Sequence, residues 1–275
     1  MTEQADRREF AGHVAVVTGS GSGIGAATAH AFASEGAAVY LFDINRDRVN
    51  VVVAEIRAAF GTDSAVPIVV DIIDDDAVAA AIFTVTSNRG VIDHLVNCAV
   101  DFVAAGVGAT RAQWDHAFGV NVTGQAMLTA QASAFMLPGS TVVNISSISA
   151  HAAQPDRWTY NACKAAILAL TRGEALDLRG KGIRVNAVSP GWIWTPEVAR
   201  AAGFDREKWE PVWGRYHILE RLGEPSEIAD AVLYLSSKRS SFITGTELFV
   251  DGGYNAIGPE GLGDTANFAG TTPTR

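Results

Sequence analysis

The chain has 275 residues, of which 48% are hydrophobic and 19% are charged, and this balance is typical of a globular protein with an apolar core. Its formal net charge is −9 and it contains no basic run, which argues against nucleic acid or an anionic membrane surface as a partner. No apolar run approaches the roughly 20 residues that cross a bilayer, and the polar residues 1–10 do not resemble a signal peptide. The two cysteines, Cys98 and Cys163, are too few for a disulfide framework. We therefore expect a cytoplasmic protein without a metal site.

Short apolar runs rich in β-branched residues alternate along the chain with segments of helical spacing. The expected strands are residues 13–19, 38–43, 66–71, 94–99, 141–147, 183–189 and 248–251. The expected helices are residues 24–34, 48–60, 75–87, 111–135, 159–178 and 226–237, with Asp74 and Ser226 as expected N-caps. This alternation predicts an α/β fold, namely a single doubly wound parallel sheet of the Rossmann-like type.

The domain organisation is predicted from where this alternation stops. No Pro/Ser-rich linker divides the chain before about residue 257, so residues 1–257 are expected to form one dinucleotide-binding catalytic domain. Residues 195–217 interrupt the alternation and predict a small helical lid, about residues 195–218. The tail, residues 258–275, is rich in Gly and Thr. It is either a flexible end or an arm ordered against a neighbour.

A glycine-rich loop follows the first expected strand and opens a helix of small residues. Its sequence is Thr-Gly-Ser-Gly-Ser-Gly-Ile-Gly, residues 18–25. Glycine allows a sharp turn and a close approach of backbone to phosphate, and the first amides of the helix then face the anion. This context favours a dinucleotide site over the alternative, an unliganded tight turn. The residues expected to contact the cofactor here are Gly19, Ser20, Ser22, Gly23 and Ile24.

The choice of cofactor is predicted from Asp43, which closes the second expected strand. A carboxylate in this place accepts hydrogen bonds from the ribose hydroxyls of NAD and repels the 2′-phosphate of NADP. NADP would call for a cation here, whereas the neighbouring residue is Ile44 and the cation that we note nearby is Arg46. The sequence therefore favours NAD. The alternative is that Asp43 only caps the next helix.

Tyr160 and Lys164 are four residues apart in an expected helix, so they project from one face. A phenol with an ordinary pKa of about 10 is a poor base, but a nearby ammonium stabilises the phenolate and lowers that pKa. Ser147 ends the strand just upstream, at the edge where α/β sheets bind ligands, and its hydroxyl can hold a substrate oxygen. These groups predict proton transfer coupled to hydride transfer between a carbinol carbon and a nicotinamide.

Taken in order, these motifs resemble the short-chain dehydrogenase/reductase family. They are the glycine-rich loop, Asn121 in Asn-Val-Thr-Gly, Ser147, Tyr160-x-x-x-Lys164 and Pro190-Gly191. The resemblance runs from about residue 12 to residue 253. It implies that Tyr160 is the acid/base, that Ser147 orients the substrate oxygen, and that Lys164 binds the nicotinamide ribose and lowers the tyrosine pKa. It also implies that Asn121 holds a water that links Lys164 to solvent.

The resemblance implies further cofactor contacts along the edge of the sheet. These are Asp71 and Ile72 at the adenine, Asn97 and Ala99 at the end of the fourth strand, and Pro190, Gly191, Ile193 and Thr195 at the carboxamide. Val100 departs from the family, which has a glycine there, and a β-branched residue disfavours a positive φ. The family also implies a homotetramer in which helices 111–135 and 159–178 pair across a two-fold axis.

The substrate pocket is expected to include polar and aromatic side chains near the catalytic groups. Its expected residues are Asp101, Gln154, Arg157, Trp158 and Trp192. This mixture suits a hydroxylated ring, a sugar or a polyol, although the tryptophans could only pack and Asp156 could form a surface ion pair with Arg157. The predicted activity is NAD-dependent oxidation of a secondary alcohol. The alternatives are a reductase of ketones or acyl thioesters and a non-catalytic dinucleotide-binding scaffold or sensor.

Overall fold

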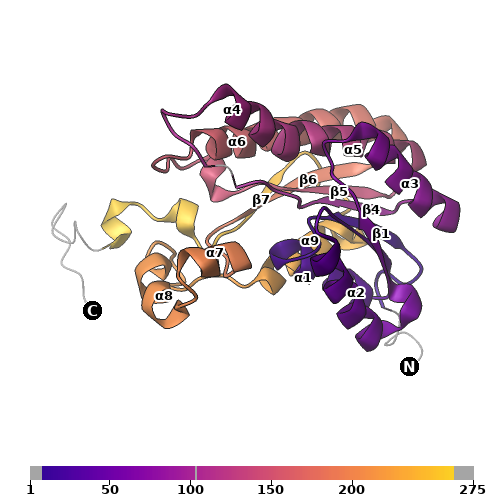
Figure 1. Cartoon of the computed structure of the whole chain (residues 1–275), viewed down its shortest axis with the longest axis horizontal. Helices are drawn as coiled ribbons and strands as arrows, with labels where there is room; N and C mark the ends of the chain where they lie inside the picture. Colours follow the sequence, from indigo (N-terminus) through magenta and orange to yellow (C-terminus); the bar gives the residue numbers. More distant parts are fainter. Residues whose placement is uncertain (1–7, 103, 263–275) are drawn as a thin grey trace.

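The computed structural model describes residues 8–102 and 104–262, and within them seven parallel strands form one sheet (Figure 1). Their order across the sheet is β3-β2-β1-β4-β5-β6-β7. The strands are β1 Val14–Thr18, β2 Ala38–Asp43, β3 Ala65–Val69, β4 His94–Asn97, β5 Thr141–Ile145, β6 Arg184–Pro190 and β7 Glu247–Val250. The chain runs outward from β1 to one edge, returns, and then runs to the other edge. The predicted doubly wound parallel sheet is therefore confirmed.

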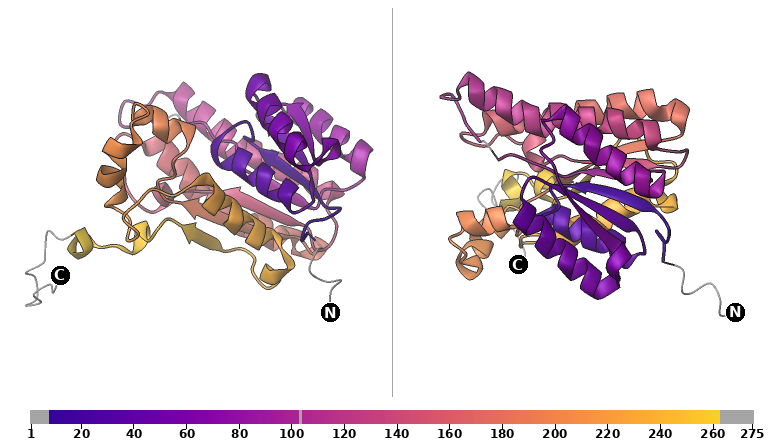
Figure 2. Two further views of the ribbon diagram at one scale, coloured as in Figure 1. Left: turned by 90° about the horizontal axis from the view of Figure 1, so that it is seen from below. Right: turned by 45° about the vertical axis from the view of Figure 1, so that its right-hand side comes forward.

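Helices cover both faces of the sheet, as Figures 1 and 2 show. The helices of one layer are α1 Gly23–Ser34, α2 Arg46–Phe60 and α9 Pro225–Ser236. Those of the other layer are α3 Asp75–Arg89, α4 Arg111–Phe118, α5 Gln125–Ala132 and α6 Trp158–Leu178. Because both faces are covered, the strands are buried on both sides and read as continuous apolar runs.

The core consists of two clusters, one on each side of the sheet. In β1, Ala15 and Val17 pack with Phe32 on the α1 side, whereas Val14 and Val16 belong to the cluster on the α3 side. This alternation follows from the two-residue period of a strand. Since all five β1 side chains are buried, the strand is fixed in register and its carboxyl end is held in place.

Most expected bounds differ from the observed ones by a few residues, and two differences concern how a helix is built. The predicted helix 111–135 is divided by a π-helical segment, Gly119–Gly124, which lies between α4 and α5 and contains Asn121. Such segments often lie at functional sites. The predicted N-cap Asp74 is confirmed, because its side chain accepts from the amides of Asp76 and Ala77. The predicted N-cap Ser226 is wrong: Glu224 caps α9, and a proline follows it at the first helical position.

The segment after β6 contains two short helices, α7 Pro196–Ala201 and α8 Arg206–Gly214, where the sequence predicts a helical lid. In Figure 2, left, these orange helices lie at one end of the sheet. Most of the predicted tail, residues 258–275, lies outside the described residues, so the domain boundary at residue 257 stays a prediction. In the part of the chain that the structure describes, no helix is both long enough and apolar enough to cross a membrane.

Candidate active site

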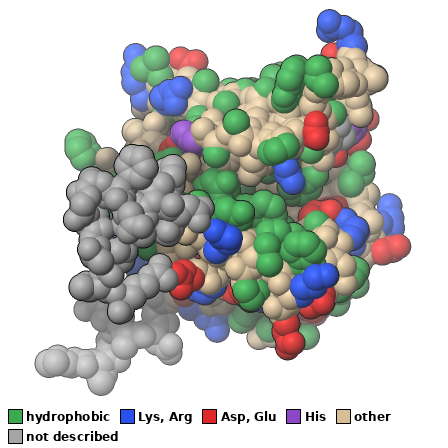
Figure 3. Space-filling view, turned by 90° about the vertical axis from the view of Figure 1, so that its left-hand side faces the viewer, with side chains coloured by type: hydrophobic (Ala, Val, Ile, Leu, Met, Phe, Trp, Pro, Cys, Tyr) green, Lys and Arg blue, Asp and Glu red, His purple; other side chains and the backbone are tan. Residues whose placement is uncertain are grey.

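Two adjoining cavities lie at the carboxyl ends of the strands. The first cavity, about 440 Å³, is lined by the loops that follow β1, β2, β3 and β4. The second cavity, about 270 Å³, is lined by the end of β5, the start of α6 and the segment after β6. Residues common to both are Ile24, Val100, Phe102, Thr195 and Glu197. Figure 3 shows the end of the molecule that carries the lid, where apolar side chains gather across the middle of the face.

The glycine-rich loop leaves no room for side chains at two positions. A Cβ on Gly25 would lie 2.2 Å from the carbonyl oxygen of Gly19. A Cβ on Gly19 would lie 2.8 Å from the Cα of Ala99, and Gly19 also has a φ of +62°. Both contacts are closer than a side chain tolerates, so glycine alone lets the loop pack against α1 and the end of β4.

The N-terminus of α1 is open toward the first cavity. Its N-cap, Ser22, makes no side-chain hydrogen bond to the helix amides, and its first turn carries no acidic residue. Gly23, Ile24 and Gly25 line the cavity at this point. Uncapped amides at a helix N-terminus favour an anion, so this part of the cavity fits the phosphates of a dinucleotide. Ser20, in contrast, is buried and donates to the carbonyl of Phe42, so it supports the loop.

Asp43 ends β2 and lines the first cavity. Its Oδ2 accepts from the Gly21 amide at 2.8 Å, and its Oδ1 accepts from the Asn45 amide at 2.8 Å. These bonds orient the carboxylate, and each oxygen has a further lone pair for a ligand. The cation that lines this cavity is Arg48, not Arg46, which corrects the expectation from the sequence.

The other expected cofactor residues divide into two groups. Asp71, Ile72 and Ala99 line the first cavity. Pro190, Gly191, Ile193 and Thr195 line the second cavity, and Thr195 also reaches the first and caps α7. Asn97 lines neither cavity. Its amide donates to Thr129 at 2.9 Å and to Asn144 at 2.8 Å, so it ties β4 to β5 and α5.

Val100 stands where the family has a glycine, and the structure shows why a valine is tolerated. Among the described residues other than glycine, a positive φ occurs at Asp156, Phe204 and Glu220 and not at Val100. The expected conflict with a β-branched side chain therefore does not arise. Val100 lines both cavities, so it forms part of the wall at their junction.

Tyr160 and Lys164 project from one face of α6 into the second cavity, and both are buried. Ser147, after β5, lies against the tyrosine. The Ser147 oxygen accepts from the Ser149 amide at 3.1 Å, which leaves its own proton free to donate. A hydrogen bond from Ser147 lowers the pKa of Tyr160, but burial has the larger effect and raises that pKa to about 12.

Lys164 is bonded to the backbone in this structure, and its expected effect on the tyrosine pKa stays a prediction. Its Nζ donates to the Ile145 carbonyl at 2.8 Å and lies 5.6 Å from the centre of the Tyr160 ring. Burial lowers the pKa of Lys164 to about 8. The tyrosine pKa is therefore raised rather than lowered in the protein by itself, because both groups are removed from water and the ammonium is bonded to a strand carbonyl.

Asn121 lies on the π-helical segment and is fully buried. Its Nδ2 donates to the Asp101 carbonyl at 2.9 Å, and its Oδ1 accepts from the Asp101 amide at 3.0 Å. This paired contact fixes the loop that follows β4. The same loop carries Phe102, whose ring stacks on Tyr160 at a centroid distance of 5.6 Å. Asn121 thus helps to shape the cavity around the tyrosine.

The expected substrate residues do not all reach the second cavity. Gln154, Arg157 and Trp192 line it, and Gln154 accepts from the Ser149 hydroxyl at 2.9 Å. Asp101 lines the first cavity instead, with His116 2.7 Å from its carboxylate. Trp158 lines neither cavity and is 55% exposed, so its expected substrate contact is wrong.

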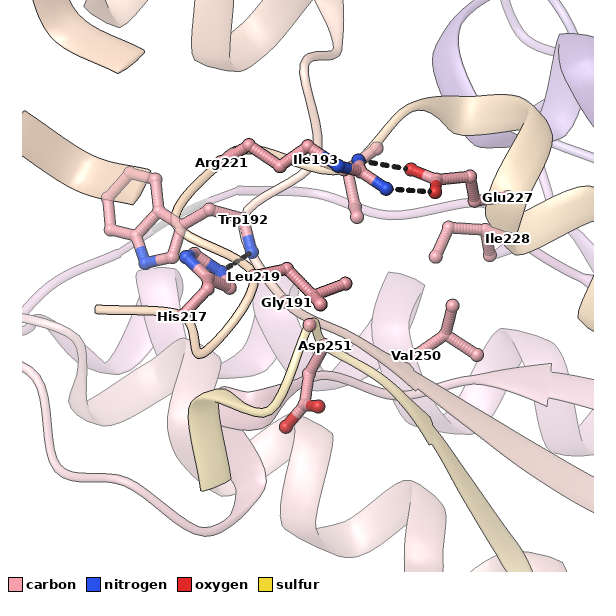
Figure 4. Close-up of a pocket in the computed structure, with 12 residues that line it drawn as sticks. Gly191, Trp192, Ile193, His217, Leu219, Arg221, Glu227, Ile228, Val250 and Asp251 are labelled. Carbon is pink, nitrogen blue, oxygen red and sulfur yellow. Dashed lines mark hydrogen bonds and ion pairs between the residues drawn. The ribbon is translucent and has the colours of Figure 1, made fainter. Parts of the chain in front are cut away.

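The lid is joined to the second cavity by stacked tryptophans. Trp192 stacks on Trp213 at 5.2 Å, and Trp213 stacks on Trp209 at 4.9 Å. Behind them, His217 accepts from the Trp192 amide at 3.2 Å, beside a small cavity of about 100 Å³ (Figure 4). His217 is buried, and burial lowers its pKa, which keeps the imidazole neutral and able to accept. These contacts hold the Pro190–Gly191–Trp192 backbone in place.

Sequence reasoning missed several residues of the two cavities. Arg48 lines the first cavity, and Val198 and Ala201 of α7 line the second. Arg48 lies in the first turn of α2, which begins three residues after Asp43 ends β2. This closeness in sequence could have predicted that Arg48 lines the same cavity. The sequence placed Val198 and Ala201 in the lid, but no spacing marks which lid residues line the cavity or that His217 contacts Trp192.

Comparison with known proteins agrees with this geometry. A family described as "Enoyl-(Acyl carrier protein) reductase" matches residues 19–255. The chain is 36% identical to the cis-4-hydroxycyclohexanecarboxylate dehydrogenase of Sinomonas cyclohexanicum, over 90% of this chain and 98% of that protein. It is 34% identical to the 3-oxoacyl-[acyl-carrier-protein] reductase of Thermotoga maritima, over 88% and 97%. The solved aldohexose dehydrogenase of Thermoplasma acidophilum superposes with a TM-score of 0.82, at 32% identity over 92% and 97%.

The family match spans the glycine-rich loop, the catalytic side chains and the end of β7. The relatives cover nearly the whole chain. The solved aldohexose dehydrogenase is similar to it in both fold and sequence. These matches agree with the two adjoining cavities and with the cluster of Ser147, Tyr160 and Lys164 in the second one. The chain belongs to the short-chain dehydrogenase/reductase family of nicotinamide-dependent oxidoreductases.

Proposed function

We propose that this protein oxidises a secondary alcohol on a hydroxylated ring, a sugar or a polyol to the ketone, with NAD as its cofactor. The observation that carries the proposal is the position of Ser147, Tyr160 and Lys164 in a small cavity that opens onto a second one suited to a dinucleotide. At about 270 Å³, this substrate cavity lies just below the range of about 300–1,000 Å³ that holds drug-sized ligands. A small substrate therefore fits it.

The residues that would hold NAD lie along the strand ends. The open N-terminus of α1 would bind the phosphates, Asp43 the adenine ribose, and Asp71 and Ile72 would border the adenine. Ile193 and Thr195 would lie at the carboxamide. When bound, the nicotinamide supplies the acceptor for the hydride that leaves the carbinol carbon.

The chain's own groups handle the proton. Ser147 donates a hydrogen bond to the substrate oxygen, and Tyr160, as the phenolate, takes the hydroxyl proton while the carbon–oxygen double bond forms. Because burial raises the pKa of Tyr160 to about 12, the phenolate needs positive charge close by. Lys164 supplies it once its ammonium is turned from the Ile145 carbonyl toward the ribose and the phenol. The two electrons leave with the hydride, so alcohol and NAD give ketone, NADH and one proton.

The preference for NAD rests on Asp43. Its carboxylate is fixed by the Gly21 and Asn45 amides and faces the cavity where a ribose hydroxyl would lie. A 2′-phosphate at that place would meet a negative charge held in position. Arg48 lines the same cavity and opposes this effect. We give Asp43 the larger weight because two amides bind it at the end of β2, whereas the Arg48 side chain is long and flexible.

The names of two similar proteins support a ring substrate. One relative is named for a hydroxycyclohexanecarboxylate and one similar structure for an aldohexose, and both of these compounds carry hydroxyl groups on a ring. Another relative is named as a 3-oxoacyl reductase. One observation favours that second candidate function, reduction of a ketone or acyl thioester. A Tyr160 pKa of about 12 keeps the phenol protonated at neutral pH, which is the form that donates a proton to a carbonyl.

One panel of assays tests both functions. Purified protein is given NAD or NADP with cyclic polyols, sugars and simple secondary alcohols, and separately NADH or NADPH with the matching ketones and a 3-oxoacyl thioester. Formation or loss of the reduced cofactor is followed by its absorbance. We expect the highest kcat/KM with NAD and a ring alcohol. A kcat/KM that is higher for the thioester with NADPH would replace the dehydrogenase by the reductase.

We also propose a cytoplasmic homotetramer that uses the α5–α6 face. Apolar side chains on this face are partly exposed: Met127 is 38%, Phe135 41% and Leu176 58% accessible. The helices α5 and α6 lie in the same outer layer (Figure 1), so a second copy can pack on both. Light scattering at micromolar concentration should give four times the mass of one chain, and a monomer there would contradict the assembly.

A further inference from the structure

The second cavity contains a positive charge that the reaction proposed above does not use. The charged side chains that line it are Arg157, Lys164 and Glu197. Lys164 donates to the Ile145 carbonyl, and Glu197 pairs with Arg200 on its own helix. Within residues 8–102 and 104–262, the guanidinium of Arg157 makes neither an ion pair nor a hydrogen bond. The expected surface pair with Asp156 is not formed.

Arg157 is held in place by the backbone around it. It is the N-cap of α6, and Asp156 before it has a φ of +55°, which is strained for a residue other than glycine. Asp156 packs closely on Gly106, where a Cβ would lie 2.7 Å from its Oδ1. Thr159 and Ala105 exchange two hydrogen bonds, of 3.1 and 3.3 Å, that join the same two segments. The start of α6 is thus fixed against the loop after β4. This contact keeps the Arg157 backbone in place beside the cavity.

Arg157 is also close enough to the catalytic tyrosine to act on it electrostatically. Its charge lowers the pKa of Tyr160, after the larger effect of Ser147 and against the effect of burial. Arg157 and Tyr160 line the same cavity, so a ligand group bound to Arg157 would share it with the phenol oxygen that receives the proton of the substrate hydroxyl.

We propose that the substrate is an anion: a secondary ring alcohol with a carboxylate, which the unpaired Arg157 binds while the hydroxyl lies against Ser147 and Tyr160. This rests on the proposed function and narrows its substrate class. A planar guanidinium binds a carboxylate through two parallel hydrogen bonds. The other cation that lines this cavity, Lys164, takes part in the proposed reaction, so Arg157 is the cation left for a substrate anion.

The first experiment compares two substrates of nearly the same shape, cis-4-hydroxycyclohexanecarboxylate and its neutral primary amide, each with NAD. In the unchanged protein we expect kcat/KM to be about ten- to hundredfold higher for the carboxylate, since a charge-assisted bond is present with it alone. In Arg157→Gln, KM for the carboxylate should rise until the ratio approaches one, while the amide is little affected. Arg157→Lys should restore part of the preference. Arg111→Gln, at the exposed start of α4, is the matched control and should keep the full preference.

The second experiment does not depend on turnover. Calorimetry measures binding of cyclohexanecarboxylate and cyclohexanecarboxamide, which lack the reacting hydroxyl, to the same variants, with circular dichroism to verify folding. The carboxylate should bind to the unchanged protein and to Arg111→Gln, and at least tenfold more weakly to Arg157→Gln. Equal kcat/KM for carboxylate and amide, or an equal loss of both in Arg157→Gln, would overturn the anionic substrate even if neutral ring alcohols are oxidised. If no alcohol is oxidised, the proposed function fails, and the calorimetric comparison still decides whether Arg157 is an anion site.

Discussion

The two cavities are built in different ways. The first, suited to the dinucleotide, has backbone at the end where the phosphates would lie: the glycine-rich loop, the amides at the start of α1 and a carboxylate fixed by two further amides. The second is formed by side chains from segments that are far apart in the chain, namely the end of β5, the start of α6 and the lid. A site made by backbone depends on the fold and is hard to change by substitution. Side chains that line a cavity can be substituted without disturbing the fold. The comparison explains how one family keeps its cofactor while its substrates differ.

The largest effect is expected at the tyrosine of the second cavity. Tyr160→Phe removes the oxygen that exchanges the proton and should lower kcat by about 10²–10⁴-fold, while NAD binding is nearly unchanged. Steady-state kinetics and NAD titration measure the two quantities. Tyr234→Phe on α9 lines neither cavity and serves as the control. A Phe variant with the unchanged kcat would refute the role of the tyrosine.

The next largest effect should appear in the first cavity alone. Asp43→Ser combined with Ile44→Arg removes the repulsion of a 2′-phosphate and adds a guanidinium that pairs with it. The ratio of kcat/KM for NAD to that for NADP should fall by roughly 10²–10³, because bonds to charged groups contribute about 1.5–3 kcal/mol each. Ile44→Arg alone separates the two contributions. If the unchanged protein already uses both cofactors equally, Asp43 does not select the ribose, and Arg48 becomes the residue to change.

A single added methyl group tests whether the backbone of the glycine-rich loop shapes the first cavity. Gly25→Ala would bring a Cβ to 2.2 Å from the Gly19 carbonyl oxygen. Overpacking of this kind typically costs about 1–3 kcal/mol, so NAD affinity should fall by roughly ten- to hundredfold as the loop is displaced. Gly108→Ala, with no atom within 4 Å of the added Cβ, is the control. Unchanged NAD affinity in Gly25→Ala would show that the loop does not need this contact.

The smallest effect is expected from the lid side of the second cavity. Trp213→Leu removes the middle ring of the tryptophan stack that supports Trp192. Since an aromatic pair contributes about 0.5–1.5 kcal/mol, KM for the alcohol should rise by roughly two- to tenfold with NAD affinity unchanged. Trp158→Leu, at an exposed position outside both cavities, should leave KM unaffected. Equal behaviour of the two variants would mean that the stack does not position the substrate wall.

The sequence by itself determined the fold and most of the first cavity. Continuous apolar runs of strand length and segments with helical spacing follow from local geometry, and the glycine-rich loop occupies a fixed place between β1 and α1. Ser147, Tyr160 and Lys164 could be predicted as site residues because they lie close together in the sequence, the first at a strand end and the other two on one helix. Asp43 was identified for the same reason, since it marks the end of a strand.

Tertiary structure alone decided what depends on contacts between distant segments. Arg48 rather than Arg46 lines the first cavity. Asn97 hydrogen-bonds to neighbouring elements instead of lining a cavity, and Trp158 is exposed outside both cavities. The tertiary structure also left the Arg157 guanidinium in the second cavity without a partner among the residues that the structure describes. Burial raised the Tyr160 pKa although a lysine lies one helical turn away. Desolvation and the choice of hydrogen-bond partner are set by everything packed around a group, and no spacing along the chain encodes them.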